Sequence, residues 1–342
     1  MLLFYNTPDL CDRYKHIAGV DLINDHRKII GSNNSMFFDR TETFKLPIAL
    51  KNQFPIPKID HNFTKTYEDI CDQTASEIIN KAVNSNKKIR ILWSGGIDST
   101  LILITFLKQG QRDILEVGLS IESIAENYDF YKNHLLGRVK LIPATDLKSL
   151  ASSDCVLVGG EYNDQLLGSN LLPTFVRYYD VNDLHNTFNL DKLKKVFSSR
   201  YTINVDTWID IYLSIAEKSP IQIKTNLDFH WWINFSCKWQ GLYYRLASYF
   251  PESCDLENYC HFFQTEDFQQ WSLLNHSQEF NRWEDYKKIC KDLIWQFDKN
   301  DEYRNKKTKL ESLTFLAQKN VFCNYIDEHG RHHQDLPDHC LN

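Results

Sequence analysis

Apolar positions between residues 66 and 160 follow two different periods. Over residues 66–84, small or apolar side chains recur at every fourth position, and Thr66 and Asp69 have the spacing of a helix capping box. This segment is therefore expected to form a helix with one buried face, which ends at the polar residues 84–88. The recurring positions are Ile70, Thr74, Ile78 and Ala82.

Compact apolar runs alternate with helix-like segments after this helix. The runs occupy residues 89–93, 113–120, 138–144 and 154–160. Residues 99–110 are too uniformly apolar for a surface helix and end at a glycine, and residues 122–136 have the pattern of an amphipathic helix. Strands that alternate with helices predict an α/β fold built on a doubly wound parallel sheet with right-handed crossovers.

Differences in composition and residue pattern divide the chain into four parts. Residues 1–65 mix strand-like runs with turn residues and prolines, so a small N-terminal module or arm is expected. Residues 66–184 form the predicted α/β core. Residues 185–320 are rich in aromatic residues and poor in β-branched runs, which indicates a mostly helical region on the substrate side. Residues 321–342 have the composition of a polar C-terminal tail.

Overall composition narrows the classes of function. The chain has 342 residues and a net charge of −6, so it has no overall excess of basic residues with which to bind the phosphates of a nucleic acid. No apolar run is long enough for a membrane span, and the N-terminus lacks the order of a signal peptide, so a cytoplasmic protein is expected. The nine cysteines are scattered without a C-x-x-C pair, which favours reduced thiols.

A glycine-rich loop, Ser-Gly-Gly-Ile-Asp-Ser at 94–99, lies between the first predicted strand and its helix. Two glycines let a backbone come close to a ligand, and the surrounding hydroxyl groups and helix N-terminus suit phosphate oxygens. The loop has no lysine of the Walker A type. Its aspartate would repel a phosphate unless a cation such as Mg²⁺ stands between them. The alternative is a tight turn in which Asp98 or Ser99 is the helix N-cap. The expected phosphate-binding residues are Ser94, Gly95, Gly96, Asp98, Ser99 and Thr100.

In this context the loop resembles the pyrophosphate loop of the N-type ATP pyrophosphatases, which cut ATP between the α and β phosphates to adenylate a substrate. A second segment, 158–169, is similar to the G-E-G-S-D-E-x-F-G-G segment of asparagine-synthetase-type domains. The residues that match are Gly160, Glu161, Asp164 and Gly168, whereas Tyr162, Asn163, Gln165 and Ser169 depart from the pattern. The resemblance thus points to the branch of asparagine synthetase, β-lactam synthetase and lasso-peptide cyclase.

The resemblance implies a role for each matching residue. Asp164 would complete a Mg²⁺ shell with Asp98, Gly160 would let the backbone pack against adenine, and Glu161 would face the reacting centre as a general base or an orienting group. A third segment, 302–312, is similar to the place where a lysine of the family neutralises departing pyrophosphate, and its candidates are Lys306 and Lys307. The strand ends expected to contact the nucleotide and its adenine are Leu92, Leu119 and Ser120.

The function expected from these motifs is an ATP-dependent ligase that adenylates a small-molecule or peptide carboxylate and passes the acyl group to ammonia or an amine. Glutamine-dependent asparagine synthetases carry a glutaminase domain whose nucleophilic cysteine follows Met1, but residue 2 here is leucine and the first cysteine is Cys11. Ammonia would then be free or come from a separate partner.

Three alternatives stay open. The first is a nucleobase-modifying or tRNA-modifying enzyme with the same adenylation chemistry, against which the acidic balance argues. The second is a degenerate protein that binds a nucleotide or a partner without turnover. The third concerns only the tail, whose histidines and cysteines suggest zinc although their spacing matches no standard structural zinc pattern. These tail residues are Cys323, His329, His332, His333, His339 and Cys340.

Overall fold

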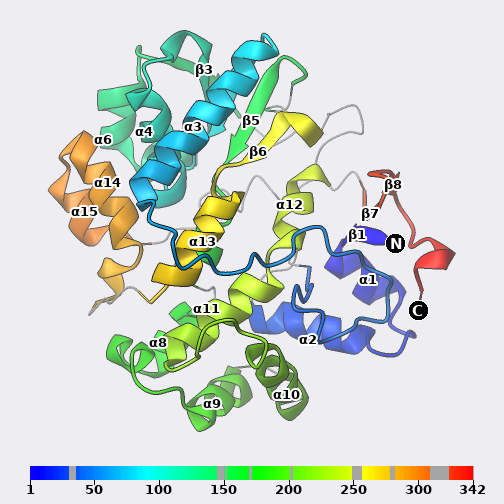
Figure 1. The fold of residues 1–342 in the computed structure, drawn as a ribbon. Coiled ribbons are helices and arrows are strands. Elements are labelled where there is room, and N and C mark those ends of the chain that lie inside the picture. Colours follow the sequence, from blue (N-terminus) through cyan, green and yellow to red (C-terminus); the bar gives the residue numbers. More distant parts are fainter. Residues whose placement is uncertain are drawn as a thin grey trace.

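A parallel sheet lies at the centre of the fold in the computed structural model (Figure 1). The structure describes residues 1–30, 36–144, 150, 152–168, 172–200, 203–248, 256–277, 282–308 and 323–341. Five strands pair in parallel in the order β4-β3-β2-β5-β6, which confirms an α/β fold with a parallel sheet. These strands are β2 (Lys88–Leu92), β3 (Leu115–Leu119), β4 (Lys140–Pro143), β5 (Cys155–Gly159) and β6 (Tyr259–His261).

Four of the five strands are the apolar runs that the sequence predicts, and β6 is not. Its residues Tyr-Cys-His lie in the aromatic region that was expected to be mostly helical. Only three residues long, β6 gains its strand conformation by pairing with β5, where Leu157 faces Tyr259 and Gly159 faces His261. A strand of this length has no periodicity of its own from which it can be recognised.

The helices of the predicted core agree with the pattern except at one place. α3 (Tyr67–Asn84) starts at the capping box of Thr66 and Asp69, and α4 (Ile97–Lys108) is buried over most of its length. The single helix expected over residues 122–136 is instead divided into α5 (Ile121–Glu126), α6 (Tyr128–Phe130) and one wide turn at Tyr131–Leu135. The division falls at Asn127, whose side chain accepts a hydrogen bond from the Phe130 backbone and so starts a new helix.

The described residues between β5 and the C-terminal strands are mostly helical, and many of their aromatic side chains lie in the core. Figure 1 shows α8 to α11 gathered at one end of the molecule, while α14 and α15 lie beside α4. Trp231, Trp232 and Trp239 are fully buried. The α-helices are α7 (Asn163–Leu167), α8 (Leu172–Tyr178), α9 (Leu190–Arg200), α10 (Val205–Ala216), α11 (Asn226–Cys237), α12 (Gln240–Ala247), α13 (Glu266–Asn275), α14 (Lys288–Asp298) and α15 (Asp301–Lys306). Short 3₁₀ turns occupy Arg112–Ile114, Val181–Leu184, Leu256–Asn258, Phe262–Gln264, Trp283–Asp285 and Asp338–Cys340.

The two ends of the chain meet in a small antiparallel sheet, which joins the expected N-terminal module or arm to the expected polar C-terminal tail. β1 (Leu2–Tyr5) pairs with β7 (Tyr325–Asp327), which pairs with β8 (His332–His333). The helices α1 (Thr7–Arg13) and α2 (Val20–Ile30) follow β1. β7 is buried because it lies next to an apolar strand 320 residues away in sequence, a contact that a polar local composition hides.

The zinc hypothesis for the tail finds no support in the described residues, where no group of three or more His, Cys, Asp or Glu side chains suits a metal ion. His333 Nε2 lies 2.9 Å from Asp327 Oδ2, which Arg331 also contacts. Among the described helices, none combines the length and the apolar composition needed to cross a membrane.

Candidate functional site

The two predicted motifs lie at the point where the order of the sheet diverges. From β2 the chain continues to β3 and β4 on one side, and β5 and β6 lie on the other side. β2 and β5 are neighbours, so the segments that follow their carboxyl ends, 93–98 and 160–164, meet there. In open α/β sheets this is the position where ligands bind.

Hydrogen bonds among hydroxyl and backbone groups fix the shape of the loop after β2. The hydroxyl of Ser99 accepts a bond from the Ser94 backbone N–H at 3.0 Å, and the hydroxyls of these two serines lie 2.9 Å apart. The Ser94 hydroxyl also accepts a bond from the Gly96 N–H at 3.2 Å. The predicted phosphate-binding residues Ser94, Gly96 and Ser99 therefore form one interconnected turn.

Gly95 is required where the loop passes over α5. Its φ of +78° is a conformation that side chains rarely adopt, and a Cβ atom here would lie 2.5 Å from the carbonyl oxygen of Ser123 and 2.9 Å from Glu126 Cβ. The glycine thus lets the loop rest directly on the α5 backbone.

The structure shows no side-chain cap at the N-terminus of α4. Its N-cap is Gly96, which makes no side-chain cap, so the reading of Asp98 or Ser99 as an N-cap is wrong. The first N–H groups of a helix lack intrahelical acceptors and are free for an anion. Thr100, in contrast, is fully buried and accepts a bond from Trp93 Nε1 at 3.0 Å, so its hydroxyl points into the core and not toward a ligand.

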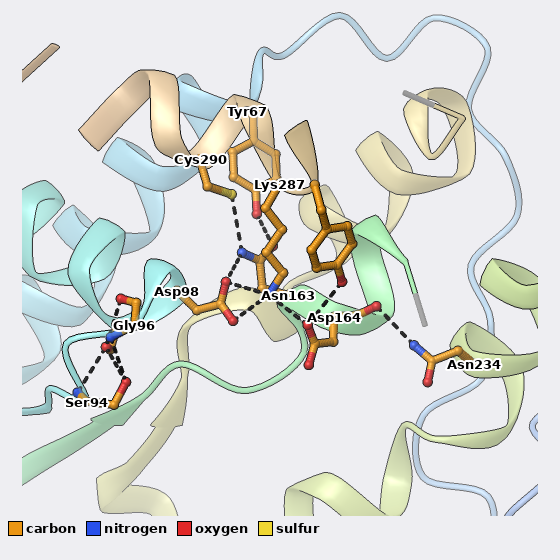
Figure 2. A network of polar contacts seen from close by, with 11 residues as sticks. Tyr67, Ser94, Gly96, Asp98, Asn163, Asp164, Asn234, Lys287 and Cys290 are labelled. Atoms are coloured by element: carbon orange, nitrogen blue, oxygen red, sulfur yellow. Dashed lines mark hydrogen bonds and ion pairs between the residues drawn. The ribbon is translucent and has the colours of Figure 1, made fainter. Parts of the chain in front are cut away.

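Asp98 and Asp164 converge, as the motifs predict, but on a lysine that the sequence analysis did not single out (Figure 2). Lys287 Nζ donates to Asp98 Oδ1 at 2.7 Å, to Asp98 Oδ2 at 2.6 Å and to Asp164 Oδ1 at 2.8 Å. Its side chain is only 3% exposed. Lys287 precedes α14 in the left-handed conformation (φ 57°, ψ 35°), which directs it from the α14 side toward the two loops.

Neutral groups hold the two carboxylates from the other sides. Asn163 Nδ2 donates to Asp98 Oδ1 at 2.6 Å, and Asn163 Oδ1 accepts from the Tyr67 hydroxyl at 2.5 Å. The Tyr286 hydroxyl donates to Asp164 Oδ1 at 3.2 Å. Asn163, which departs from the family pattern, therefore connects α3 to the Asp98 carboxylate of the glycine-rich loop (Figure 2).

The pKa shifts of this network follow from burial and from the two carboxylates. Burial lowers the pKa of Lys287, but the negative charges of Asp164 and Asp98 outweigh it, so that its pKa stays well above the ordinary value. Burial raises the pKa of Tyr286, and Asp164 adds to this effect. Burial, followed by the charge of Asp98, raises the pKa of the Cys290 thiol to about 12. At neutral pH the lysine is charged, and the tyrosine and the thiol are neutral.

The two predicted pyrophosphate lysines have different surroundings. Lys307 donates to Glu126 Oε1 at 2.8 Å in a buried pair, with side chains 9% and 3% exposed. Glu126 lies directly under the loop, because its Oε1 is 3.4 Å from the place of a Cβ at Gly96. Lys306 is 75% exposed and pairs with Glu302 on the surface of its own helix. The structure thus brings Lys307 to the loop and leaves Lys306 in solvent.

Glu161 lies beyond the end of β5 and forms an ion pair with Arg245 of α12. Its second oxygen, Oε2, is buried and has no hydrogen-bond partner among the described residues. The next residue, Tyr162, adopts a left-handed conformation with φ +79° and donates its hydroxyl to the Trp239 carbonyl at 3.1 Å. The Glu161 side chain is thus held through one oxygen by Arg245, and its role as a general base or an orienting group stays a prediction.

The remaining predicted residues line the strand ends. A Cβ at Gly160 would lie 3.4 Å from the Ser99 N–H nitrogen, so this side of the glycine packs against the start of α4. Ser120 caps α5 in a box with Ser123. Leu92 and Leu119 are buried at the ends of β2 and β3, next to the loop.

The donor set of Asp98 and Asp164 fits only one kind of metal site. Mg²⁺ prefers six oxygen ligands, of which a protein usually supplies one or two carboxylates while substrate phosphates and water supply the rest. The part of the chain that the structure describes offers no cluster of three or more acidic, histidine or cysteine ligands. The pair therefore suits a Mg²⁺ ion bound together with phosphates, and does not suit an ion held by protein groups alone.

Sequence reasoning missed Lys287, Asn163 and Arg245. Lys287 lies 189 residues from Asp98 and next to Lys288 in a lysine-rich segment, so no local signal marks it. Asn163 departs from the family pattern directly beside a matching aspartate. This position was the one feature of the sequence that could have marked Asn163 as part of the site. No model of a known protein family matches the chain, and no protein of curated function is similar to it in sequence.

Proposed function

We propose that this protein is an ATP-dependent, AMP-forming ligase that joins a carboxylate to ammonia or an amine, with the doubly wound fold of the N-type ATP pyrophosphatases. One observation carries the proposal. Two carboxylates from the loops after neighbouring parallel strands converge beside a glycine-rich helix N-terminus at the divergence point of the sheet. The chemistry that needs carboxylates next to a phosphate cradle is cation-assisted handling of a polyphosphate.

Each group near the loop has a role in this proposal. The backbone N–H groups at the start of α4 bind phosphate oxygens, and the ammonium groups of Lys287 and Lys307 neutralise charge on the departing pyrophosphate. Mg²⁺ held by Asp98 and Asp164 would polarise the phosphates. A carboxylate oxygen of the substrate attacks the α-phosphorus as pyrophosphate leaves. An amine then attacks the acyl carbon as AMP leaves, and the loss of one proton from the amine nitrogen to solvent or to Glu161 gives an amide.

Glu161 and Arg245 lie on the substrate side of this proposed site. Glu161 Oε2 is a buried acceptor whose partner is absent from the described residues, so it suits an N–H donor such as the incoming amine. Arg245 holds the other oxygen and orients the group. The amine would be free ammonia, the product of a separate partner, or part of the substrate itself.

The test is pyrophosphate release from ATP and Mg²⁺ across a panel of carboxylates and amines. Asp98→Asn and Asp164→Asn should each lower the rate by about 100-fold, the usual loss when one group that stabilises transition-state charge is removed. Asp206→Asn is the matched control, because Asp206 is 81% exposed on α10 and its ion pair among the described residues is with Lys194, a surface lysine. Unchanged rates in both site variants would refute the proposed mechanism.

A nucleotide-binding protein without turnover is the second candidate. One observation favours it: Lys287 already satisfies both carboxylates, as it would in a site that no longer exchanges cations. Nucleotide binding measured by calorimetry, together with an absence of pyrophosphate release over the whole panel, would select this candidate. RNase sensitivity of any activity would instead indicate a nucleic-acid substrate.

A further inference from the structure

We propose that Lys287 is the built-in cation of the Asp98–Asp164 pair, so that the pair excludes a divalent metal ion until a polyphosphate arrives to accept the lysine. The first half of this inference stands on the contacts of Lys287 alone. The second half rests on the proposed function, because it needs a phosphate ligand on the loop.

The hydrogen-bonding capacity of Lys287 is fully used by the pair. An ammonium group has three N–H donors, and three carboxylate oxygens lie within 2.8 Å of Nζ. Two of them belong to Asp98 and one to Asp164. The ammonium therefore occupies the space between the carboxylates that a metal ion would need.

The fold holds Lys287 in this position, and Lys287 is not a mobile side chain on the surface. Its side chain is 3% exposed, and the ring of Tyr286 lies 5.6 Å from Nζ while its hydroxyl bonds to Asp164. Asn163 bonds to Asp98 from the opposite side. A lysine so enclosed can leave the pair only if another anion takes its charge, because a buried and unpaired ammonium is costly.

A polyphosphate on the loop would be such an anion. The N-terminus of α4 begins at Gly96, two residues before Asp98, so phosphates bound there lie close to the same pair. If Lys287 bonded to phosphate oxygens instead, Asp98 and Asp164 would be free to hold a divalent ion, which would supply positive charge for the phosphates. Metal and nucleotide would thus bind together, not one after the other.

The experiment is a titration of the full chain with Mn²⁺, in which electron paramagnetic resonance measures the free ion. Without nucleotide, the wild-type chain should bind no Mn²⁺ up to about 1 mM, the range of weak carboxylate sites. Lys287→Met should create one Mn²⁺ site. Its affinity for Mn²⁺ should be roughly tenfold or more above that of the wild-type chain without nucleotide, because two carboxylates then lack a cation. With a non-hydrolysable ATP analogue, the wild-type chain should bind one Mn²⁺ ion.

Control variants and measurements test the two halves of the inference, metal exclusion by Lys287 and its release by a polyphosphate, independently of each other. Lys291→Met is the matched variant, since Lys291 is also buried, lies one turn along α14 and bonds to the carbonyl oxygens of Glu284 and Lys307 instead of to the pair; it should gain no site. A nucleotide-independent site in the wild-type chain that Asp98→Asn removes would overturn the inference, and this arm needs no variant of Lys287 to fold. A folded Lys287→Met protein without a new site would overturn it too. If the analogue itself does not bind, the proposed function fails while the metal-exclusion result stands.

Discussion

The buried pair of Lys307 and Glu126 predicts a large difference between two adjacent lysines. Lys307→Met leaves the Glu126 carboxylate buried under the loop without its cation, and Oε2 of this carboxylate has no other partner among the described residues. Removing one member of a buried ion pair costs about 3–5 kcal/mol. Lys306→Met, on a side chain that is 75% exposed, should change the free energy of unfolding by less than about 1 kcal/mol.

The assay is urea unfolding followed by tryptophan fluorescence at pH 7. The double variant Lys307→Met/Glu126→Gln should recover most of the lost stability, because it removes both charges from the buried site. Pyrophosphate release should not recover in the double variant if Lys307 neutralises the leaving group. The combination therefore separates a loss of stability from a loss of catalysis.

Two results would refute this reasoning. Equal and small effects of the two single variants would show that Lys307 is not buried against Glu126. A double variant as unstable as Lys307→Met would show that the lost stability comes from packing of the lysine stem and not from the uncompensated carboxylate.

Two further predictions concern the loop and the buried histidines. Gly95→Ala should destabilise the protein by about 1–3 kcal/mol more than Gly110→Ala, because both glycines have a positive φ (+78° and +75°) but only a Cβ at Gly95 would collide with its neighbours; equal losses in urea unfolding would contradict this. Burial lowers the pKa of His26 and His261 to about 3 and of His230 to about 4, from 6.5. Their contribution to stability is therefore complete above pH 6.5 and is lost as the pH falls toward the folded values, with a limiting slope of about 4 kcal/mol per pH unit for three protons. His230→Phe should reduce that slope by about one third, and an unchanged slope between pH 6 and pH 5 would contradict the assignment.

The sheet was predictable from sequence where each strand carries its own signal. β5 is buried on both faces and appears as a continuous apolar run, and β2 and β3 are mostly apolar, each with one buried charged residue, Arg90 and Glu116, which pair with each other. β6 is defined by pairing with β5, and β7 by pairing with β1, so neither has a local pattern long enough to reveal it. Long-range pairing, not local propensity, decides these short strands.

The site was predictable in its two carboxylates and in Lys307, but not in Lys287. Asp98 and Asp164 each follow a buried strand, and neighbouring parallel strands bring their carboxyl ends together. Lys287 could not be recognised from the sequence, because the position of a lysine side chain depends on how its own helix packs. α14 packs against α4 and puts Lys287 over the loop, while Lys288, the next residue, starts the helix. Contacts of this kind are set by tertiary structure alone.

The charges around the loop give a physical reason why phosphate and metal should bind as one unit. Asp98, Asp164 and Glu126 contribute three negative charges, and Lys287 and Lys307 contribute two positive charges, which leaves one net negative charge in this group beside the proposed phosphate-binding loop. A free polyphosphate would be repelled by this excess, and a free divalent ion meets carboxylates that already hold lysines. A polyphosphate that carries a divalent ion brings a partner for each group at once, because its oxygens accept the lysines while the ion accepts the carboxylates. The paired lysines thus favour the combined ligand over either component.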